Sequence, residues 1–568
     1  MAWHGGKIPS LPLPGKVGLP GADRPARWQY GSVGSRVLRR RSADDGDRKM
    51  QLPYRTPLPG DPRKRRTAVL LRVAAYVAFT AAVGIPVWHF THDTISNARE
   101  VAEFDRKTAA ATSATATGDL PKRPKEHKGA IGRWCAAVKP FWAGENIYRS
   151  HEQREAADSD SRVMLHPNMP FIVILLSPLA YLPPALMALI WSLLKVAALA
   201  VSLLMTARLA ADGDRRIPDW VLALGLLWSM LTITDDVLHG NTNVFVLAAV
   251  AGHLWLFRRG SDRLSGLALA LAICLKMTPA IFLLYWLHQR CWKLLGWAAA
   301  GLVLMAAVIP AVAVGPARSA ELTQSWLENL VVPGLVKGAW YPIHVNQSLP
   351  GVFSRYLLPR DDPNGNIFWN PDDNPYDRQT QFGWISVAGL SEGAVRWLIR
   401  LCQLAVLVAA GWAIGRGKLP RADGRRALHY GLVVAAMLLM NQRTWEHHGP
   451  VLLVAWVAIW QAIAFGLLPR GGRPVALGLA LLSGAVFWLT RSDLVGSLAR
   501  AIGQTKQEAE ITADVVSAYG PFFCHVLLLF VAGVLLSAAL RTRRTAYGEN
   551  RQGLLEYSRR HAAQAKAT

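Results

Sequence analysis

Cysteine and charge are both scarce in this 568-residue chain. Its five cysteines form no Cys-x-x-Cys pair, so neither a disulfide framework nor a cysteine zinc site is indicated. Charged residues make up 18% of the chain, against roughly 25% in soluble domains, whereas 52% of its residues are apolar. These proportions exclude a disordered, a collagen-like and a soluble globular chain.

No cleavable signal peptide is predicted, because the first apolar run begins only near Ala68. The net charge of +25 could indicate nucleic-acid binding. However, the first 67 residues hold 15 Lys and Arg against 5 Asp, and the segment from Arg541 onward holds 7 more Lys and Arg. Basic residues at those places flank membrane segments and orient them. We therefore expect no nucleic-acid partner, and contact with anionic lipids is the weaker alternative.

Ten apolar stretches approach the roughly 20 residues that a helix needs to cross a bilayer. Two more, 170–184 and 264–287, are interrupted by proline, which frees backbone groups that only neighbouring protein can satisfy. We interpret these two as re-entrant or half-length helices. The sequence thus predicts an all-α, polytopic membrane protein. The ten expected spans are 68–90, 185–209, 219–233, 243–257, 294–315, 395–415, 427–440, 450–468, 474–489 and 518–540.

Charge in the short connections predicts the orientation of these spans. With the amino terminus in the cytoplasm, five internal connections carry 14 Lys and Arg, whereas three external ones carry 4. This follows the positive-inside rule and predicts a protein of the cell (inner) membrane with both termini in the cytoplasm. The long loops 92–168 and 316–394 then lie outside. We expect a basic, disordered segment 1–67, a membrane domain 68–540 and a basic tail 541–568.

Unusual polar residues gather on the predicted outer side. Asp235, Asp236, His239, Asn241 and Asn243 follow one another between two spans. The two aspartates would point about 100° apart on a helix, so one of them could act as general base or metal ligand while the other is solvated. The imidazole and the amides would hydrogen-bond a hydroxyl-rich or phosphate ligand. The alternative for the amides is a helix-capping turn.

Lys276 stands within a long apolar stretch, three residues before a proline. An unpaired ammonium at such a depth costs about 2.5–3.5 kcal/mol, so we expect a partner or a watery cavity. At the outer apex of a broken hairpin, Lys276 would neutralise a lipid phosphate. The alternatives are snorkelling and a structural salt bridge.

Two further outer segments hold candidate ligand-binding side chains. His166 and Asn168 lead into the first broken stretch, and Trp445, His447 and His448 end another outer helix. Two adjacent histidines differ from the i, i+4 pair of a helical zinc site, so hydrogen bonding to sugar or phosphate fits them better. Trp445 is suited to stacking on a sugar ring, or to simple interfacial anchoring.

The loop 316–394 is either a folded cap over an outer cavity or an inert excursion. It contains Asn346 and Gln347, and its Pro, Gly, Asn and Asp content predicts turns rather than helices.

Several segments in a shared order resemble glycosyltransferase family 87, also known as the DUF2029 group. They are WAGENIY (142–148), HPNMPFIVILLSPLAYLPPALMALIW (166–191), LHGNTN (238–243), GLALALAICLKMTPAIFLLYW (266–286), HVNQSL (344–349) and TWEHH (444–448).

The resemblance implies an α-helical membrane enzyme of the GT-C architecture. Such an enzyme takes a sugar, often mannose, from a polyprenyl phosphate on the outer face. The matching segments contribute Tyr148, His166, Asn168, Asn346 and Gln347 to the candidate substrate-binding residues.

One departure from the family pattern concerns the base. Members carry an aspartate, viewed as the catalytic base, some fifteen residues before the G-x-x-x-Y element, but here that count reaches Gly129 and Ala130. Either Asp235, Asp236 or another outer acid such as Asp105 replaces it, or the activity is lost or changed.

The sequence therefore predicts a hexosyltransferase, with mannose as one possible sugar, that uses a polyprenyl-phosphate hexose and a lipid, glycolipid or polymer acceptor. No nucleotide-binding glycine loop is present, and we predict neither a metal site nor a cofactor besides the donor substrate. A transporter of lipid or solute is the main rival. Transporters commonly have broken helices at corresponding positions of two halves, whereas both broken stretches here lie in the amino-terminal half of the chain. An inactive scaffold of envelope assembly is the second rival.

Overall fold

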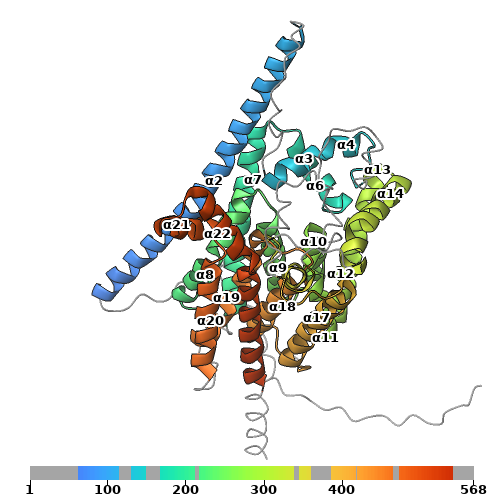
Figure 1. Ribbon diagram of the computed structural model, residues 1–568. Coiled ribbons are helices and arrows are strands. Elements are labelled where there is room, and N and C mark those ends of the chain that lie inside the picture. Colours follow the sequence, from blue (N-terminus) through green and yellow to red (C-terminus); the bar gives the residue numbers. More distant parts are fainter. Residues whose placement is uncertain are drawn as a thin grey trace, which may run out of the picture. The chain divides into compact units, whose positions relative to one another are not determined.

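The computed structural model describes residues 62–113, 129–148, 167–211, 217–337, 344–359, 386–417, 419–464 and 472–541. All of them belong to the unit Pro53–Thr568, which separates from Met1–Leu52. These residues form helices and connecting turns without a strand, which confirms the all-α class for this part of the chain (Figure 1). The predicted terminal segments 1–67 and 541–568 and the residue His166 fall wholly or mostly outside the described residues.

The helices follow one another in this order: α2 Pro62–Ser113, α3 Gly129–Ala136, α4 Val138–Trp142, α6 Pro170–Ala180, α7 Pro184–Ala210, α8 Asp219–Leu238, α9 Asn243–Arg258, α10 Asp262–Leu275, η1 Thr278–Ala280, α11 Ile281–His288, α12 Trp292–Val303, η2 Leu304–Val308, α13 Ile309–Val314, α14 Pro316–Trp326, η3 Leu327–Val331, η4 Pro333–Lys337, α15 Leu349–Leu357, α17 Glu392–Ile414, α18 Arg426–Met440, η7 Glu446–Leu452, α19 Leu453–Ala464, α20 Gly472–Trp488, α21 Ser492–Ala501 and α22 Lys506–Ala518. A last helix covers residues 521–541.

The predicted count of ten spans is not confirmed. Among the described residues, six helices are long and apolar enough to cross a membrane, or seven if the bent pair that joins most of α20 to α21 is one span. Two expected spans are the shorter helices α9 and α18, of 16 and 15 residues. At 1.5 Å per residue they measure about 24 and 22 Å, less than the roughly 30 Å of a hydrocarbon core. The first expected span lies within the 52-residue α2, which is not among the six.

Both predicted helix interruptions are present. α6 ends at Ala180, and α7 begins only at Pro184, which occupies the first helical position that proline favours. α10 ends at Leu275 because Lys276 has extended backbone angles, φ −162° and ψ 131°. The short η1, with Pro279 in its first turn, then leads into α11. Each interruption places helix ends where a continuous span would have none.

The loop 316–394 differs from the prediction of turns. Its first part forms the helices α14, η3 and η4, and α15 follows at Leu349. Pro316 and Pro350 stand in the first turns of α14 and α15, where proline's fixed φ is compatible with a helix. Ser348 caps α15 by accepting a hydrogen bond from the Gly351 amide, 3.0 Å away. These prolines therefore lie at the starts of helices and not in the turns that the sequence predicted. Residues 360–385 lie outside the described part.

Close helix contacts hold the fold together around the buried helices α18 and α19. α10 and α12 lie close together at Gly266, where an added Cβ would lie 2.7 Å from the Leu294 carbonyl oxygen and 2.6 Å from the Trp297 Cβ. Figure 1 shows α3, α4 and α6 grouped at one end of this unit, beside α13 and α14. The α3 backbone bonds to the turn after α8, where the Ala130 amide donates to the His239 carbonyl over 2.8 Å.

Substituting Gly266 by valine tests the α10–α12 contact. The side chain has no room against backbone atoms, so we expect a loss of about 1–3 kcal/mol in stability and a lower unfolding temperature in detergent. Gly296→Val on α12 is the matched control, because nothing lies within 4 Å of a Cβ built there. Equal unfolding temperatures for the two variants would contradict this packing.

Candidate active site

The ends of α8, α9, α10 and η7 meet around five of the polar residues singled out in the sequence. Hydrogen bonds and ion pairs join these residues into two neighbouring groups, one buried and one partly exposed. Side chains that are distant in the chain thus form a single polar site. The five are Asp235 and Asp236 in the last turn of α8, Asn243 at the start of α9, Lys276 directly after α10, and His447 in η7.

Asp236 is the centre of the buried group. Its Oδ2 lies 2.9 Å from the Lys195 ammonium, which also donates to the Asp236 carbonyl over 2.6 Å. Its Oδ1 accepts from both the backbone amide and the side-chain amide of Asn243, over 3.0 and 2.9 Å. Asp236 and Lys195 are 0% and 1% exposed. A carboxylate with both oxygens bonded and its charge paired is suited to positioning other groups.

Lys276 forms the open end of this buried group. Its ammonium donates to the Asn243 Oδ1 over 2.7 Å. Because the Asn243 NH2 donates to Asp236, the amide oxygen must face Lys276, so Asp236 fixes the direction of that bond. An ammonium has three donors, and Asn243 occupies one of them. The half-buried Lys276 can therefore offer its remaining donors and its charge to an anionic ligand.

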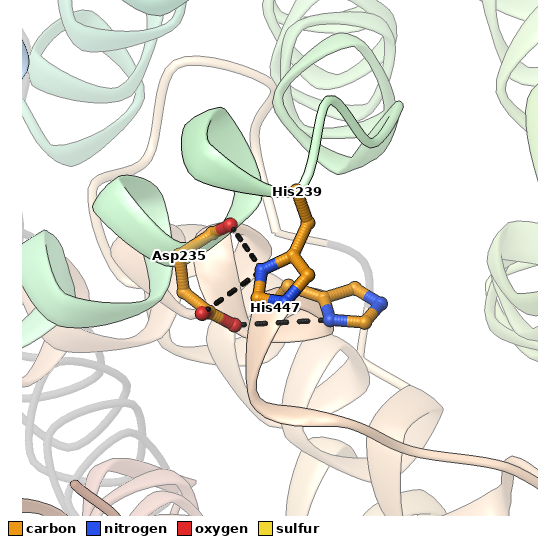
Figure 2. Close-up of side chains that lie close together, drawn as sticks. All are labelled: Asp235, His239 and His447. Atoms are coloured by element: carbon orange, nitrogen blue, oxygen red, sulfur yellow. Dashed lines mark hydrogen bonds and ion pairs between the residues drawn. The ribbon is translucent and has the colours of Figure 1, made fainter. Parts of the chain in front are cut away.

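Asp235 is the centre of the partly exposed group (Figure 2). The His239 Nδ1 lies 3.1 Å from the Asp235 Oδ1 and donates to the Asp235 carbonyl over 2.9 Å. The His447 Nδ1 approaches the Asp235 Oδ2 to 3.7 Å. The hydrogen bond from His239 to Asp235 raises the pKa of His239 to about 9. His239 is therefore an imidazolium at neutral pH, and it loses this charge as the pH rises through about 9.

Trp445 and His448 surround His447. The Trp445 ring meets the His447 ring edge-on with centroids 5.1 Å apart, and it is parallel to the His448 ring at 6.4 Å. The His448 Nδ1 accepts from the Trp445 amide over 3.3 Å. His447 is 5% exposed, so its orientation is set by these neighbours. The structure thus places these predicted residues beside Asp235 as a packed unit.

The turn between α8 and α9 holds the two groups at their spacing. Gly240 has φ 62°, and a Cβ built there would lie 2.7 Å from the Phe90 ring of α2, so glycine is required. Asn241 donates its backbone amide to the Asp236 carbonyl over 3.1 Å, and its side chain accepts from the Thr242 amide over 3.3 Å. Asn241 closes the turn but does not cap α9, because the cap position is Thr242 and no side chain makes a capping hydrogen bond there.

Tyr148 and Asn168, both predicted to bind substrate, bond to each other. The Tyr148 hydroxyl donates to the Asn168 carbonyl over 2.7 Å, and the Tyr148 carbonyl accepts from Asn329 over 2.8 Å. Tyr148 is 0% exposed. These bonds tie the first outer segment to α6 and η3, which is a structural role.

Asn346 and Gln347 likewise connect segments. The Asn346 Oδ1 accepts from the Thr444 amide over 3.1 Å, and the Gln347 side chain donates to the Ser517 carbonyl over 2.8 Å. Both residues are buried. They attach the start of α15 to the chain before η7 and to α22.

Lys195 is the functional candidate that the sequence analysis missed. It lies in the middle of α7, inside a long apolar window. The argument applied to Lys276 holds for it equally, because a lone ammonium in an apolar helix requires a partner. That signal would have identified Lys195, although not Asp236 as its partner.

The acids that could replace the missing first-loop aspartate lie at different distances from the site. Asp105 lies fifteen residues beyond Phe90 on α2, which is about 22 Å along a helix. Because Phe90 packs on Gly240, Asp105 is remote from the site. Asp93 lies only one turn beyond Phe90 and has a side chain 54% exposed. Asp93 is thus the first-loop acid nearest to the site along this helix.

Comparison with known proteins identifies the family. Residues 168–441 match the model of glycosyltransferase family 87, and this segment contains α8, α9, α10 and Lys276. The matched segment is just under half of the chain, and over it the chain is similar to this family. The resemblance found in the sequence is thereby confirmed. No solved structure matches the chain.

Two relatives of the family 87 chain carry related names. The polyprenol-phosphate-mannose-dependent alpha-(1-2)-phosphatidylinositol pentamannoside mannosyltransferase of Mycolicibacterium smegmatis is 35% identical over 136 residues, 23% of this chain and 31% of the relative. The polyprenol-phosphate-mannose-dependent alpha-(1-2)-phosphatidylinositol mannoside mannosyltransferase of Mycobacterium tuberculosis is 26% identical over 393 residues, 66% of this chain and 78% of the relative. The match thus spans about a third of the first relative and most of the second.

Breaking the buried ion pair tests the central contact of the site. Lys195→Met leaves the Asp236 carboxylate buried without its counter-charge, so we expect a loss of about 3–5 kcal/mol in stability. The double variant Lys195→Met/Asp236→Leu removes both charges and should lose less than the sum of the single variants. Unfolding temperatures in detergent give the comparison. Strictly additive losses would show that the two side chains do not interact.

Proposed function

We propose that this family 87 chain is a membrane mannosyltransferase that moves mannose from a polyprenyl phosphate to a hydroxyl of a glycolipid. The proposal is supported by the family match, which covers Asp235, Asn243 and Lys276 and ends before His447, and by the names of both relatives. One structural observation carries it. The ammonium of Lys276 stands at the open end of a buried chain of bonds that fixes its position.

The charge of the donor changes in a way that suits Lys276. A polyprenyl-phosphate sugar is a phosphodiester with one negative charge, whereas the departing polyprenyl phosphate is a monoester that develops a second. A cation held beside this phosphate stabilises the transition state more than the bound donor, and such differential binding is what accelerates a reaction. No nucleotide leaves, so the site needs no nucleotide-binding loop.

The acceptor reacts on the side of Asp235. Its hydroxyl oxygen attacks C1 of the mannose, and the bond between C1 and the phosphate oxygen breaks with both electrons remaining on the phosphate. The acceptor proton passes to the Asp235 carboxylate, the less buried of the two aspartates, with a side chain 17% exposed. Asp236 acts as a positioning residue, because both of its oxygens are already hydrogen-bonded.

The side of the membrane on which the enzyme works is inferred from the charges of the short connections. The short connections rich in Lys and Arg favour an amino terminus in the cytoplasm, and with that orientation the ends of α8 and α10 that carry the site would face outward. The protein is thus a multi-pass protein of the cell membrane that works on its extracytoplasmic face. Its partners are membrane lipids, the donor and a glycolipid acceptor.

Turnover by site variants tests the proposal. In proteoliposomes with radiolabelled polyprenyl-phosphate mannose and a phosphatidylinositol mannoside acceptor, we expect Lys276→Ala to lower the rate by about 10²–10³-fold, the usual cost of one group that stabilises developing charge. Asp235→Asn should also abolish most turnover, because an amide cannot accept the proton. The control is Lys293→Ala, which removes an exposed lysine at the start of α12.

Three results would change the assignment. Unchanged rates in Lys276→Ala would reject the phosphate site. Full activity of Asp235→Asn together with an inactive Asp93→Asn would move the base to the first outer segment. Equal transfer from polyprenyl-phosphate glucose would reject mannose as the preferred sugar, and transport of the donor without conversion would favour the transporter.

A further inference from the structure

Three potential metal ligands converge at the open edge of the site. One donor atom from each of Asp235, His239 and His447 lies within 4.8 Å of the other two (Figure 2). Asp235 and His239 are an i, i+4 pair at the end of α8, and η7 supplies His447. Side chains that are four residues apart at the end of a helix point to the same side, as they do in helical zinc sites.

The spacing of these atoms matches a metal site. Two ligands bound to zinc at about 2.0–2.1 Å with tetrahedral angles lie about 3.4 Å apart. The His239 Nδ1 lies 3.1 Å from the Asp235 Oδ1, and the His447 Nδ1 lies 3.7 Å from the Asp235 Oδ2. With one donor atom from each residue, the three donors lie within 4.8 Å of one another, somewhat wider than that value. Small rotations of the side chains would bring the three donors around one ion.

We propose that Asp235, His239 and His447 bind one zinc-class divalent metal ion and leave a coordination position open toward the acceptor. This inference deepens the proposed function and rests on it for the role of the ion. Two imidazoles and one carboxylate are the donor set of many zinc sites with an open position. Magnesium and calcium prefer oxygen ligands throughout, so they fit this set less well.

Charge and packing around the three residues favour such an ion. The Asp236 carboxylate is paired with Lys195, whereas the Asp235 carboxylate faces both histidines. His447 is held by the Trp445 and His448 rings, and supporting contacts of this kind orient metal-binding histidines. Without metal, a proton links His239 to Asp235. The ion would take the place of that proton, which lowers its apparent affinity without preventing binding.

The ion would complete the chemistry proposed for Asp235. A zinc ion lowers the pKa of a bound oxygen, so an acceptor hydroxyl in the open position would lose its proton more readily. One Asp235 oxygen would bind the ion while the other accepts the proton. The acceptor oxygen, the mannose C1 and the leaving phosphate then react as described above, with no additional reactant.

Metal binding can be measured independently of turnover. Full-length protein in detergent is treated with a chelator, dialysed against zinc and analysed for metal content, and Co²⁺ in place of zinc supplies an absorption spectrum that reports nitrogen and oxygen ligands. We expect about one ion per chain. His239→Ala and His447→Ala should each weaken zinc binding by more than the about 10–100-fold lost when a supporting group is removed. His89→Ala is the control, because His89 is exposed and lies on α2.

Each outcome decides the inference. One zinc per chain that is lost in both histidine variants, with a Co²⁺ spectrum free of thiolate bands, supports it. Zinc that persists in these variants belongs to the cysteines and overturns it, as does a wild type without zinc. If His447→Ala does not fold, His239→Ala gives the same readout, since its side chain is 59% exposed. Mannose transfer that continues in chelator would reject the ion and leave the proposed function intact, whereas bound zinc without any transfer would reject the function.

Discussion

The buried pair of Lys195 and Asp236 is the contact on which the site depends. Burying two charges costs more solvation than their attraction commonly returns, so such a pair is weak evidence for stability. Its contribution here is to fix the direction of neighbouring hydrogen bonds. Asp236, once held by Lys195, fixes which way the Asn243 amide points, and that amide fixes Lys276. A buried hydrogen-bonded network of this kind sets geometry because a misplaced partner would leave a charge unpaired.

The neighbouring aspartates of α8 have separate tasks because of helix geometry. Successive residues on a helix point about 100° apart, so Asp236 enters the interior toward α7 while Asp235 faces His239 and His447. The interior carboxylate is neutralised and bonded on both oxygens, and the outer one retains capacity for a proton or a cation. One turn of helix thereby supplies both the support and the group that we propose to be the reactive one.

Sequence patterns predicted the parts of the structure that depend on local chemistry. They predicted the helical class, the breaks near Pro184 and Lys276, and the cluster of polar residues at helix ends. They could not assign partners such as Lys195 for Asp236, because that pair exists only when α7 and α8 are packed. For the same reason the sequence could not predict the hydrogen bonds of Asn346 and Gln347 to Thr444 and Ser517. The binding of substrate by these two residues stays a prediction.

The break after α10 explains how a charged side chain can follow directly on an apolar helix. A helix of 14 residues is about 21 Å long, whereas the hydrocarbon core is roughly 30 Å thick, so α10 ends before it can cross. Exposed helix ends at that depth require protein partners, and Asn243 and the end of α8 provide them for Lys276. Attraction between an ammonium and a phosphate grows as the surrounding dielectric falls. A shortened helix therefore places the cation where a lipid-linked phosphate, itself anchored in the bilayer, would feel it most strongly.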